Sequence, residues 1–182
     1  MDEKQRTTSN ASIVHVVAPE DDGVKLRTII RKRMKISRRL TSKLKLAENG
    51  ITVNGRRLYM DAVLRAGDKV VVTLPVETSE QIEPQPMSLD IRYEDDSLLI
   101  VNKPSGLIVH PTLGHYRATL ANGVMHYWLE RGESYRFRPV HRIDEHTSGI
   151  VVIAKNAYVH SHLSEQLHNR TMERVYTAVV HG

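Results

Sequence analysis

Apolar positions change their spacing several times along the first part of the chain, and these changes predict its elements. A short β-rich run at 13–17 is followed, from 24 to 47, by apolar residues at helical spacing, which predict a pair of helices. Ser37 can cap the second helix, and the Asn49-Gly50 pair can end it. The chain is therefore predicted to begin with a strand and two helices.

Two more β-rich runs, at 51–53 and 69–74, follow these helices. The Asn54-Gly55 pair after the first run is typical of a type I′ turn and predicts a small hairpin. Residues 13–75 are therefore predicted to form a small domain, a helix pair on a hairpin. Residues 76–87 contain three Glu, two Pro and no periodicity, which predicts a linker that permits relative motion of the parts it joins.

A second domain is predicted from residue 88 to residue 182, with a mixed sheet and an α+β organisation. A helical pattern places Leu120, Val124 and Trp128 on one face, and core packing of Trp128 is favoured over base stacking. The β-rich runs of this domain lie at 98–103, 150–154 and 174–182, and its helical patterns lie at 119–129 and 156–170.

Composition limits the class of protein. The chain has 182 residues, of which 40% are hydrophobic and 26% charged, as is ordinary for a globular protein of one or two domains. No apolar run approaches the ~20 residues of a membrane span, and the polar residues 1–10 are expected to be disordered, without a signal region. Cysteine is absent, which excludes disulfides and thiolate chemistry and fits a cytoplasmic location.

Positive charge is concentrated in the predicted helix pair. Residues 24–47 hold ten Lys or Arg and no acid, in a chain of net charge +5. Each side chain that reaches a phosphate releases counterions, so this face predicts salt-dependent binding of a polyanion. Charge alone leaves open the alternative of a solvated face without a partner. The basic residues expected on the face are Arg38, Arg39, Lys43 and Lys45.

Three short motifs in this region carry a resemblance to a known family. Ile-Ser-Arg-Arg at 36–39, Gly-Ile-Thr-Val-Asn-Gly at 50–55 and Gly-Asp-Lys-Val at 67–70 are similar to motifs of the small RNA-binding domain named after ribosomal protein S-four. In that family the helix pair and the following turn grip structured RNA. The resemblance therefore implies that Asn54, in the turn, joins the basic residues at the RNA.

A polar loop at 138–149 is the most distinctive stretch of the second half. Two Arg and two His flank Asp144, and Gly149 closes the loop before a run of β-branched residues. A loop held rigidly by a strand is a common seat for catalysis. From the residues alone, a surface turn with a solvated or salt-bridged Asp144 is the commoner alternative.

The loop resembles the His-Arg-Leu-Asp-x-x-Thr-Ser-Gly signature of the RluA/RluD-type pseudouridine synthases, with Ile143 in place of Leu. The resemblance implies that Asp144 is the essential catalytic residue. It also implies that Arg142 takes the place of the flipped uridine in the RNA stack and that His141, beside it, contacts the RNA. Many such enzymes carry an S-four-like domain in front of the catalytic one, so the two resemblances agree in order.

Matches on both sides of the loop extend the resemblance. Residues 95–111 are similar to the stretch that precedes the catalytic loop in the family, and within them Lys103 either meets a phosphate or ends a strand in solvent. Residues 174–182 resemble the motif Lys-x-Tyr-x-Ala-x-Val-x-Gly, with Arg174 in place of Lys. This match implies that Tyr176 lies in the active site, and strand packing is the alternative.

The implied reaction breaks the bond between uracil and the anomeric carbon, turns the base and rejoins it through ring carbon 5. It has no redox step and loses no group, so no cofactor is expected. Ionised Asp144 either attacks the anomeric carbon or takes a proton from the neighbouring sugar carbon, and Tyr176 can act as the base at carbon 5. No metal site is expected, because His160 and His162 do not share a helix face.

In the RluA/RluD family the sequence continues beyond the Tyr motif and supplies a basic partner for the catalytic Asp. The chain is therefore expected to be a fragment with impaired or absent activity. Two functions stay open, an RNA pseudouridine synthase acting on uridines of large-subunit ribosomal RNA and a non-catalytic RNA-binding fragment. The expected partner is structured RNA, and the expected state is a monomer without a protein or membrane partner.

Overall fold

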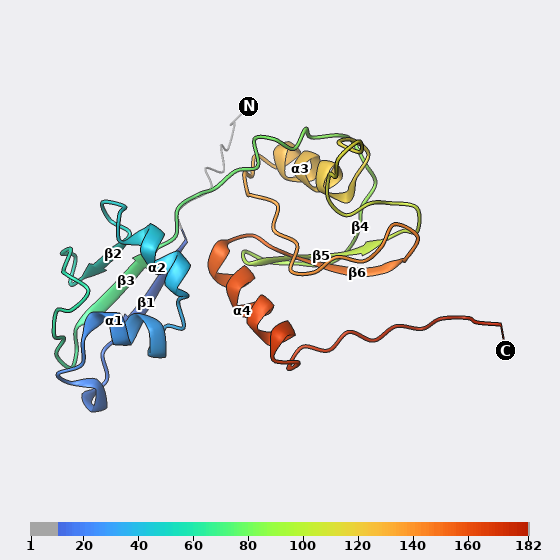
Figure 1. The fold of residues 1–182 in the computed structure, drawn as a ribbon. Helices are drawn as coiled ribbons and strands as arrows, with labels where there is room; N and C mark the ends of the chain where they lie inside the picture. The colour runs from blue at the N-terminus through green and yellow to red at the C-terminus, as the bar shows by residue number, and fades with distance from the viewer. Residues whose placement is uncertain (1–10, 182) are drawn as a thin grey trace.

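Two three-stranded antiparallel sheets, one in each half of the chain, organise the fold (Figure 1). The computed structural model describes residues 11–181. The expectation of disorder at 1–10 and the last residue of the predicted strand at 174–182 lie outside this range. Within it, no helix is long and apolar enough to cross a bilayer.

The first half builds a sheet of order β1-β3-β2 with helical segments packed on it. The first predicted helix is irregular, because a single α-helical turn runs directly into a π-helix. The second predicted helix is regular. The bounds are β1 at Ser12–Val16, a 3₁₀ turn at Pro19–Asp21, α1 at Leu26–Thr28, the π-helix at Ile29–Arg33, α2 at Arg38–Leu44, β2 at Ile51–Val53 and β3 at Lys69–Thr73.

Local signals in the sequence set the ends of these elements. The Ser37 hydroxyl accepts a hydrogen bond from a backbone N–H of the first turn of α2 at 3.3 Å, as predicted for a cap. Asn54 and Gly55 have φ values of 50° and 77°, as a type I′ turn requires. Val53 and Arg56 close this turn with two backbone hydrogen bonds, but the chain then leaves the sheet, and the ladder partner of β2 is β3.

The core of the first half lies between the helical segments and β3. Leu26, Ile29 and Ile30, spaced one helical turn apart, are fully buried at 0% exposure. They pack in one cluster with Val70 and Val72, which lie on one face of β3 and are also at 0%. The apolar residues that predicted a helix from their spacing are therefore the residues that pack in this core.

The second half builds a sheet of order β4-β5-β6. We predicted a mixed sheet, but every ladder of the described residues is antiparallel, and the parallel contact is an isolated bridge between Ile108 and Thr119. A short turn joins β4 to β5, and a connection of this kind permits only antiparallel pairing. The bounds are β4 at Asp90–Glu94, β5 at Leu98–Lys103, α3 at Leu120–Glu130, β6 at Gly149–Ala154 and α4 at Ala157–His168.

The central strand β5 is apolar on both faces because α3 and α4 lie on opposite sides of the sheet (Figure 1). Leu99 and Val101 belong to the core beneath α3, where Trp128 is fully buried, as predicted. Leu98 and Ile100 point the other way and pack with residues of α4. The sheet is therefore the middle layer of the second half.

Residues 76–87, predicted to be a linker that permits motion, are anchored in both halves. Glu77 forms ion pairs with Lys43 of α2 and with Arg138 of the second half. Ile82 is only 8% exposed and belongs to the core beneath α3. This segment therefore takes part in packing in the described structure, and its predicted role as a linker that permits motion stays a prediction.

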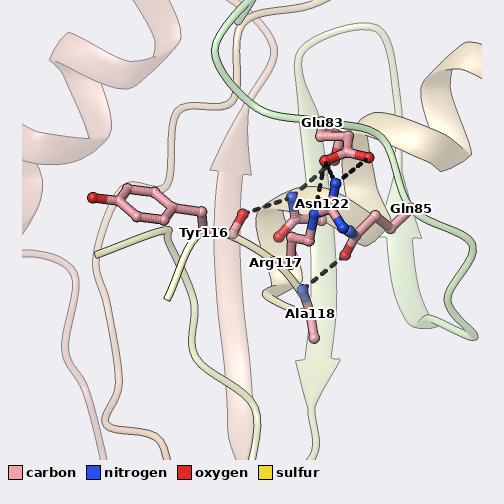
Figure 2. A network of polar contacts seen from close by, with 6 residues as sticks. All are labelled: Glu83, Gln85, Tyr116, Arg117, Ala118 and Asn122. Atoms are coloured by element: carbon pink, nitrogen blue, oxygen red, sulfur yellow. Dashed lines mark hydrogen bonds and ion pairs between the residues drawn. The ribbon is translucent and has the colours of Figure 1, made fainter. Parts of the chain in front are cut away.

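The end of this segment is bonded to the start of α3 (Figure 2). Asn122 is fully buried, and its side-chain oxygen accepts a hydrogen bond from the Thr119 N–H at 2.9 Å, which completes a capping box. Its amide group donates to the carbonyls of Glu83 at 2.8 Å and Tyr116 at 3.3 Å. One buried side chain thus caps a helix and holds two loops.

The same network has an exposed side (Figure 2). The Arg117 guanidinium pairs with the Glu83 carboxylate at 3.0 Å, and both side chains are largely in solvent. The Ala118 N–H donates to the side chain of Gln85 at 2.8 Å. These outer contacts join the same two segments as Asn122, but they are exposed to solvent.

The two halves also meet at the start of α4. The Tyr158 hydroxyl donates to the carbonyl of Met34 at 3.1 Å, and its ring packs against the core of the first half together with Ala157. With Glu77, this contact joins the two halves at a second place.

The run at 174–182, predicted to be a strand, forms no strand over residues 174–181. After α4 it extends away from the sheet (Figure 1), and Val175 and Val179 are 88% and 101% exposed. Part of the outer edge of β6 is taken by another segment, in which the Val140 N–H donates to the Val152 carbonyl at 2.8 Å. The prediction was therefore wrong for 174–181, because a β-rich sequence needs a ladder partner and the described residues provide none.

Replacing Asn122 by Ala should lower the free energy of unfolding by about 1–3 kcal/mol, because the Glu83 carbonyl and the Thr119 N–H lose their partner inside the protein. The matched variant Arg117→Ala should cost less than about 1 kcal/mol, since its ion pair is exposed. Urea unfolding followed by circular dichroism measures both values. An equal decrease in the free energy of unfolding in the two variants would contradict the larger contribution expected from the buried Asn122 amide.

Candidate active site and nucleic-acid interface

The loop that carries Asp144 lies at the end of the second sheet, where β5 stops and β6 starts. Lys103, the last residue of β5, is in register with Gly149, the first residue of β6. Gly149 has a φ of 133°, which favours glycine, at the point where the loop enters the strand. The side chains of Arg142 and Asp144 are exposed on this loop.

The turn that follows β5 holds the loop through its backbone. The Gly106 N–H donates to the carbonyl of Glu145 at 2.9 Å, and the Ser105 hydroxyl donates to the carbonyl of His146 at 2.8 Å. Two segments about forty residues apart in the sequence are therefore fixed to each other at the site.

The loop also closes on itself around Asp144. The Thr147 N–H donates to the Asp144 carbonyl at 3.1 Å. The Asp144 carboxylate makes neither a hydrogen bond nor an ion pair within residues 11–181. The backbone of Asp144 is thus held while its side chain can accept a substrate.

Lys103 lies directly behind this loop. It is fully buried, and its ammonium donates to the carbonyls of Pro104 at 2.9 Å, Leu107 at 2.6 Å and Glu145 at 2.9 Å. An ammonium has three donors, so all of them are used. We predicted that Lys103 meets a phosphate or ends a strand in solvent, and both expectations are wrong because the side chain turns inward.

The buried ammonium gives the site its electrostatic character. Burial lowers the pKa of Lys103, and the nearby charges of Glu145 and Asp144 oppose this lowering. Asp144 therefore has a cation of its own chain within electrostatic reach. The sequence offered one weak signal for this role, the Pro-Ser-Gly turn after Lys103, which lets the backbone fold around the ammonium.

His110 lies within electrostatic reach of Arg142, and the sequence predicted no role for it. Burial lowers the pKa of His110, and the positive charge of Arg142 lowers it further. Its ring stacks on Phe137 with centroids 5.8 Å apart. The available signal was its place in the family-like stretch at 95–111.

His141 faces the strand. Its Nε2 accepts a hydrogen bond from the Val152 N–H at 3.4 Å, and burial, followed by the charge of Arg174, lowers the pKa of its ring. This contact fixes the start of the loop on β6. The RNA contact predicted for His141 stays a prediction, and the structure gives the residue a positioning role.

Tyr176 is not brought to Asp144. It is 59% exposed in the extended segment after α4, and the described residues contain no contact between the two side chains. Arg174, two residues earlier, lies close enough to influence His141. The segment therefore starts near the loop and then leaves it, and the role of Tyr176 in the site stays a prediction.

The predicted basic face is only partly available. Arg38, Arg39 and Lys45 are exposed on α2 and at its end. Lys43 pairs with Glu77, so it would have to exchange this partner to reach a phosphate. Its RNA contact stays a prediction.

The side chain of Asn54 is used by the fold. Its amide group donates to the Asp68 carboxylate at 2.7 Å, and its oxygen accepts from the Lys69 N–H at 2.9 Å. These bonds tie the type I′ turn to the start of β3. Asn54 therefore shapes this corner of the domain, and its contact to RNA stays a prediction.

The loop and the turn that holds it lie within a stretch of sequence that matches a known family. Residues 97–182 match the family described as RNA pseudouridylate synthase. The chain is 45% identical over 135 residues to an uncharacterized RNA pseudouridine synthase of Bacillus subtilis, YlyB, covering 72% of this chain and 45% of the relative. It is 41% identical over 145 residues to ribosomal large subunit pseudouridine synthase D of Neisseria meningitidis serogroup B, covering 79% and 38%.

The chain thus spans less than half the length of these two relatives. A solved structure of human RNA pseudouridylate synthase domain containing 4 is 26% identical with a TM-score of 0.36, covering 44% of this chain and 30% of that one. The matched residues include Lys103, Arg142 and Asp144. They do not include 13–75, so the S-four-like domain stays a prediction.

Acidification should destabilise the protein through three partly buried histidines. Burial lowers the pKa of His110, His141 and His160 below the usual 6.5. The unfolded chain then binds protons first, so the free energy of unfolding should fall as the pH drops below about 6.5. Urea unfolding at pH 7.5 and 5.5 measures this loss, which His160→Gln should reduce and the exposed control His115→Gln should not. If acidification lowers the free energy of unfolding equally in both variants, His160 does not contribute to this pH dependence.

Proposed function

We propose that this chain acts on structured RNA and converts specific uridines to pseudouridine, as an enzyme of the RluA/RluD type. The family match and the pseudouridine synthases among its relatives support this proposal. One observation carries the proposal. The exposed Asp144 carboxylate has no partner among residues 11–181, yet its backbone is held at the end of the sheet beside the exposed Arg142. The name of the Neisseria relative supports large-subunit ribosomal RNA as the substrate class.

In this proposal the first half holds the RNA. Arg38, Arg39 and Lys45 are exposed and reach phosphates, and Lys43 joins them if the RNA displaces Glu77. Binding by these side chains releases counterions, so affinity should fall steeply with added salt. Structured RNA fits this mode because backbone contacts read its shape and need no base sequence.

The uridine must leave its stack before the chemistry can start. Extrusion costs a few kcal/mol, which a side chain that fills the vacated place can offset. Arg142 is exposed next to Asp144, and its guanidinium is planar and stacks on bases. Arg142 would therefore take the position of the flipped base while Asp144 meets its sugar.

Asp144 is the group that acts on the sugar. Its charged form attacks the anomeric carbon or removes a proton from the neighbouring sugar carbon, and either step frees the uracil. The buried Lys103 ammonium lies behind the loop and donates to the carbonyl of Glu145, the residue after Asp144, so it holds the backbone from which the carboxylate projects. Tyr176 would have to move to the loop to act as the base at carbon 5, since it lies on the extended segment after α4.

A second function is a non-catalytic RNA-binding protein. The position of Tyr176 favours it, because the described residues do not assemble the Tyr with the catalytic Asp. In this case the basic face binds RNA and the Asp144 loop has no substrate.

Tritium release from RNA labelled at uracil carbon 5 separates the two functions. The parent and the control variant Asp96→Asn, which changes an exposed carboxylate away from the loop, should release tritium. Asp144→Asn should release none and should bind the RNA as tightly as the parent, because it removes one acid and leaves the basic face unchanged. Salt-sensitive binding without release by the parent would point to the non-catalytic function. Release by Asp144→Asn would contradict the role of this residue.

A further inference from the structure

A hollow of about 540 Å³ lies on the first half of the chain. Its walls come from the end of α2, the start of β2 and the loop that follows the type I′ turn. It is separate from the Asp144 loop, which lies at the end of the other sheet. Of its lining residues, Lys45 alone has been given a role above, as a phosphate contact.

Large apolar side chains surround this hollow and are exposed. Leu46 is 77% exposed, Leu58 40% and Tyr59 87%, and all three line it. Apolar side chains that gather on a surface commonly mark a binding site. The Tyr59 ring is the one aromatic group among the lining residues, so it offers a flat surface to a ligand.

Two cations complete the wall. Lys45 and Arg57 line the hollow, and no acidic side chain does. The Arg57 guanidinium donates to the Lys45 carbonyl at 2.5 Å, which fixes it at the end of α2. Lys45 belongs both to this hollow and to the exposed basic residues on α2 and at its end, so the hollow adds an aromatic ring next to that group.

We propose that this hollow binds one unpaired nucleotide of the RNA, with its base stacked on Tyr59 and its phosphate at Lys45 and Arg57. An aromatic ring beside cations is the combination that holds single-stranded bases. An apolar segment of a protein would also fill the hollow, but it would leave the two cations without a counter-charge. The proposal rests on the RNA-binding function above and names the RNA feature that the first half recognises, a stem with an unpaired nucleotide beside it.

The test uses the full chain and two RNA hairpins with the same stem. One hairpin carries a single unpaired 2-aminopurine nucleotide beside the stem, and the other is fully paired there. Affinity is measured by fluorescence anisotropy, and stacking by the fluorescence of 2-aminopurine, which an aromatic ring quenches. The variants are Tyr59→Ala, Tyr59→Phe and the control Val63→Ala, which changes a 55% exposed apolar residue outside the hollow.

The parent, Tyr59→Phe and Val63→Ala should bind the hairpin with the unpaired base more tightly and quench its fluorescence. Tyr59→Ala should lose the quenching and about tenfold of the affinity for that hairpin alone, the size expected for one stacked base. If Tyr59→Ala binds both hairpins with the affinity, salt dependence and quenching of the parent, the proposed nucleotide site is wrong, but the RNA-binding function remains supported. The hollow would then suit an apolar segment of a protein. Absence of salt-sensitive RNA binding by the parent would overturn both.

Discussion

A buried ammonium ion holds together the two segments from which the site is built. Burying a charge is costly, and three carbonyl acceptors around Lys103 offset that cost. One acceptor is the Glu145 carbonyl, next to Asp144, so the same ion that ends β5 also positions the loop before β6. The charges of Asp144 and Glu145 further favour its charged form. Lys103 therefore both positions the loop and places a positive charge behind it.

The sheet around this ion explains why the loop can be exposed and still ordered. β5 and β6 are covered on both faces, so their ends are fixed points from which the loop extends. The linker and Asn122 tie α3 to the same unit, and α4 packs against the core of the first half. An RNA held on the first half would thus meet a site whose position is set by packing. The residues after α4, which include Tyr176, are the part that this packing leaves out.

Local signals in the sequence predicted the features that depend on a few neighbouring residues. The Ser37 cap, the Asn54-Gly55 turn and the buried Trp128 are of this kind. The inward course of Lys103 and the anchoring of 76–87 depend on residues far away in the sequence, which no local pattern contains. The run at 174–181 has the composition of a strand, but a strand also needs a partner. For the site, the motif identified the Asp144 loop, whereas the contacts that hold it came only from the structure.

The central claim is that the buried ammonium positions the Asp144 loop, and amide hydrogen exchange tests it most directly. Exchange is measured in Lys103→Met, in the parent and in the exposed control Lys69→Met. Faster exchange is predicted at the Gly106 and Thr147 amides, whose acceptors belong to the loop, with unchanged exchange in the core of β3. Unchanged protection of the two amides in Lys103→Met would contradict the account, as would a loss of protection that is uniform over the whole chain.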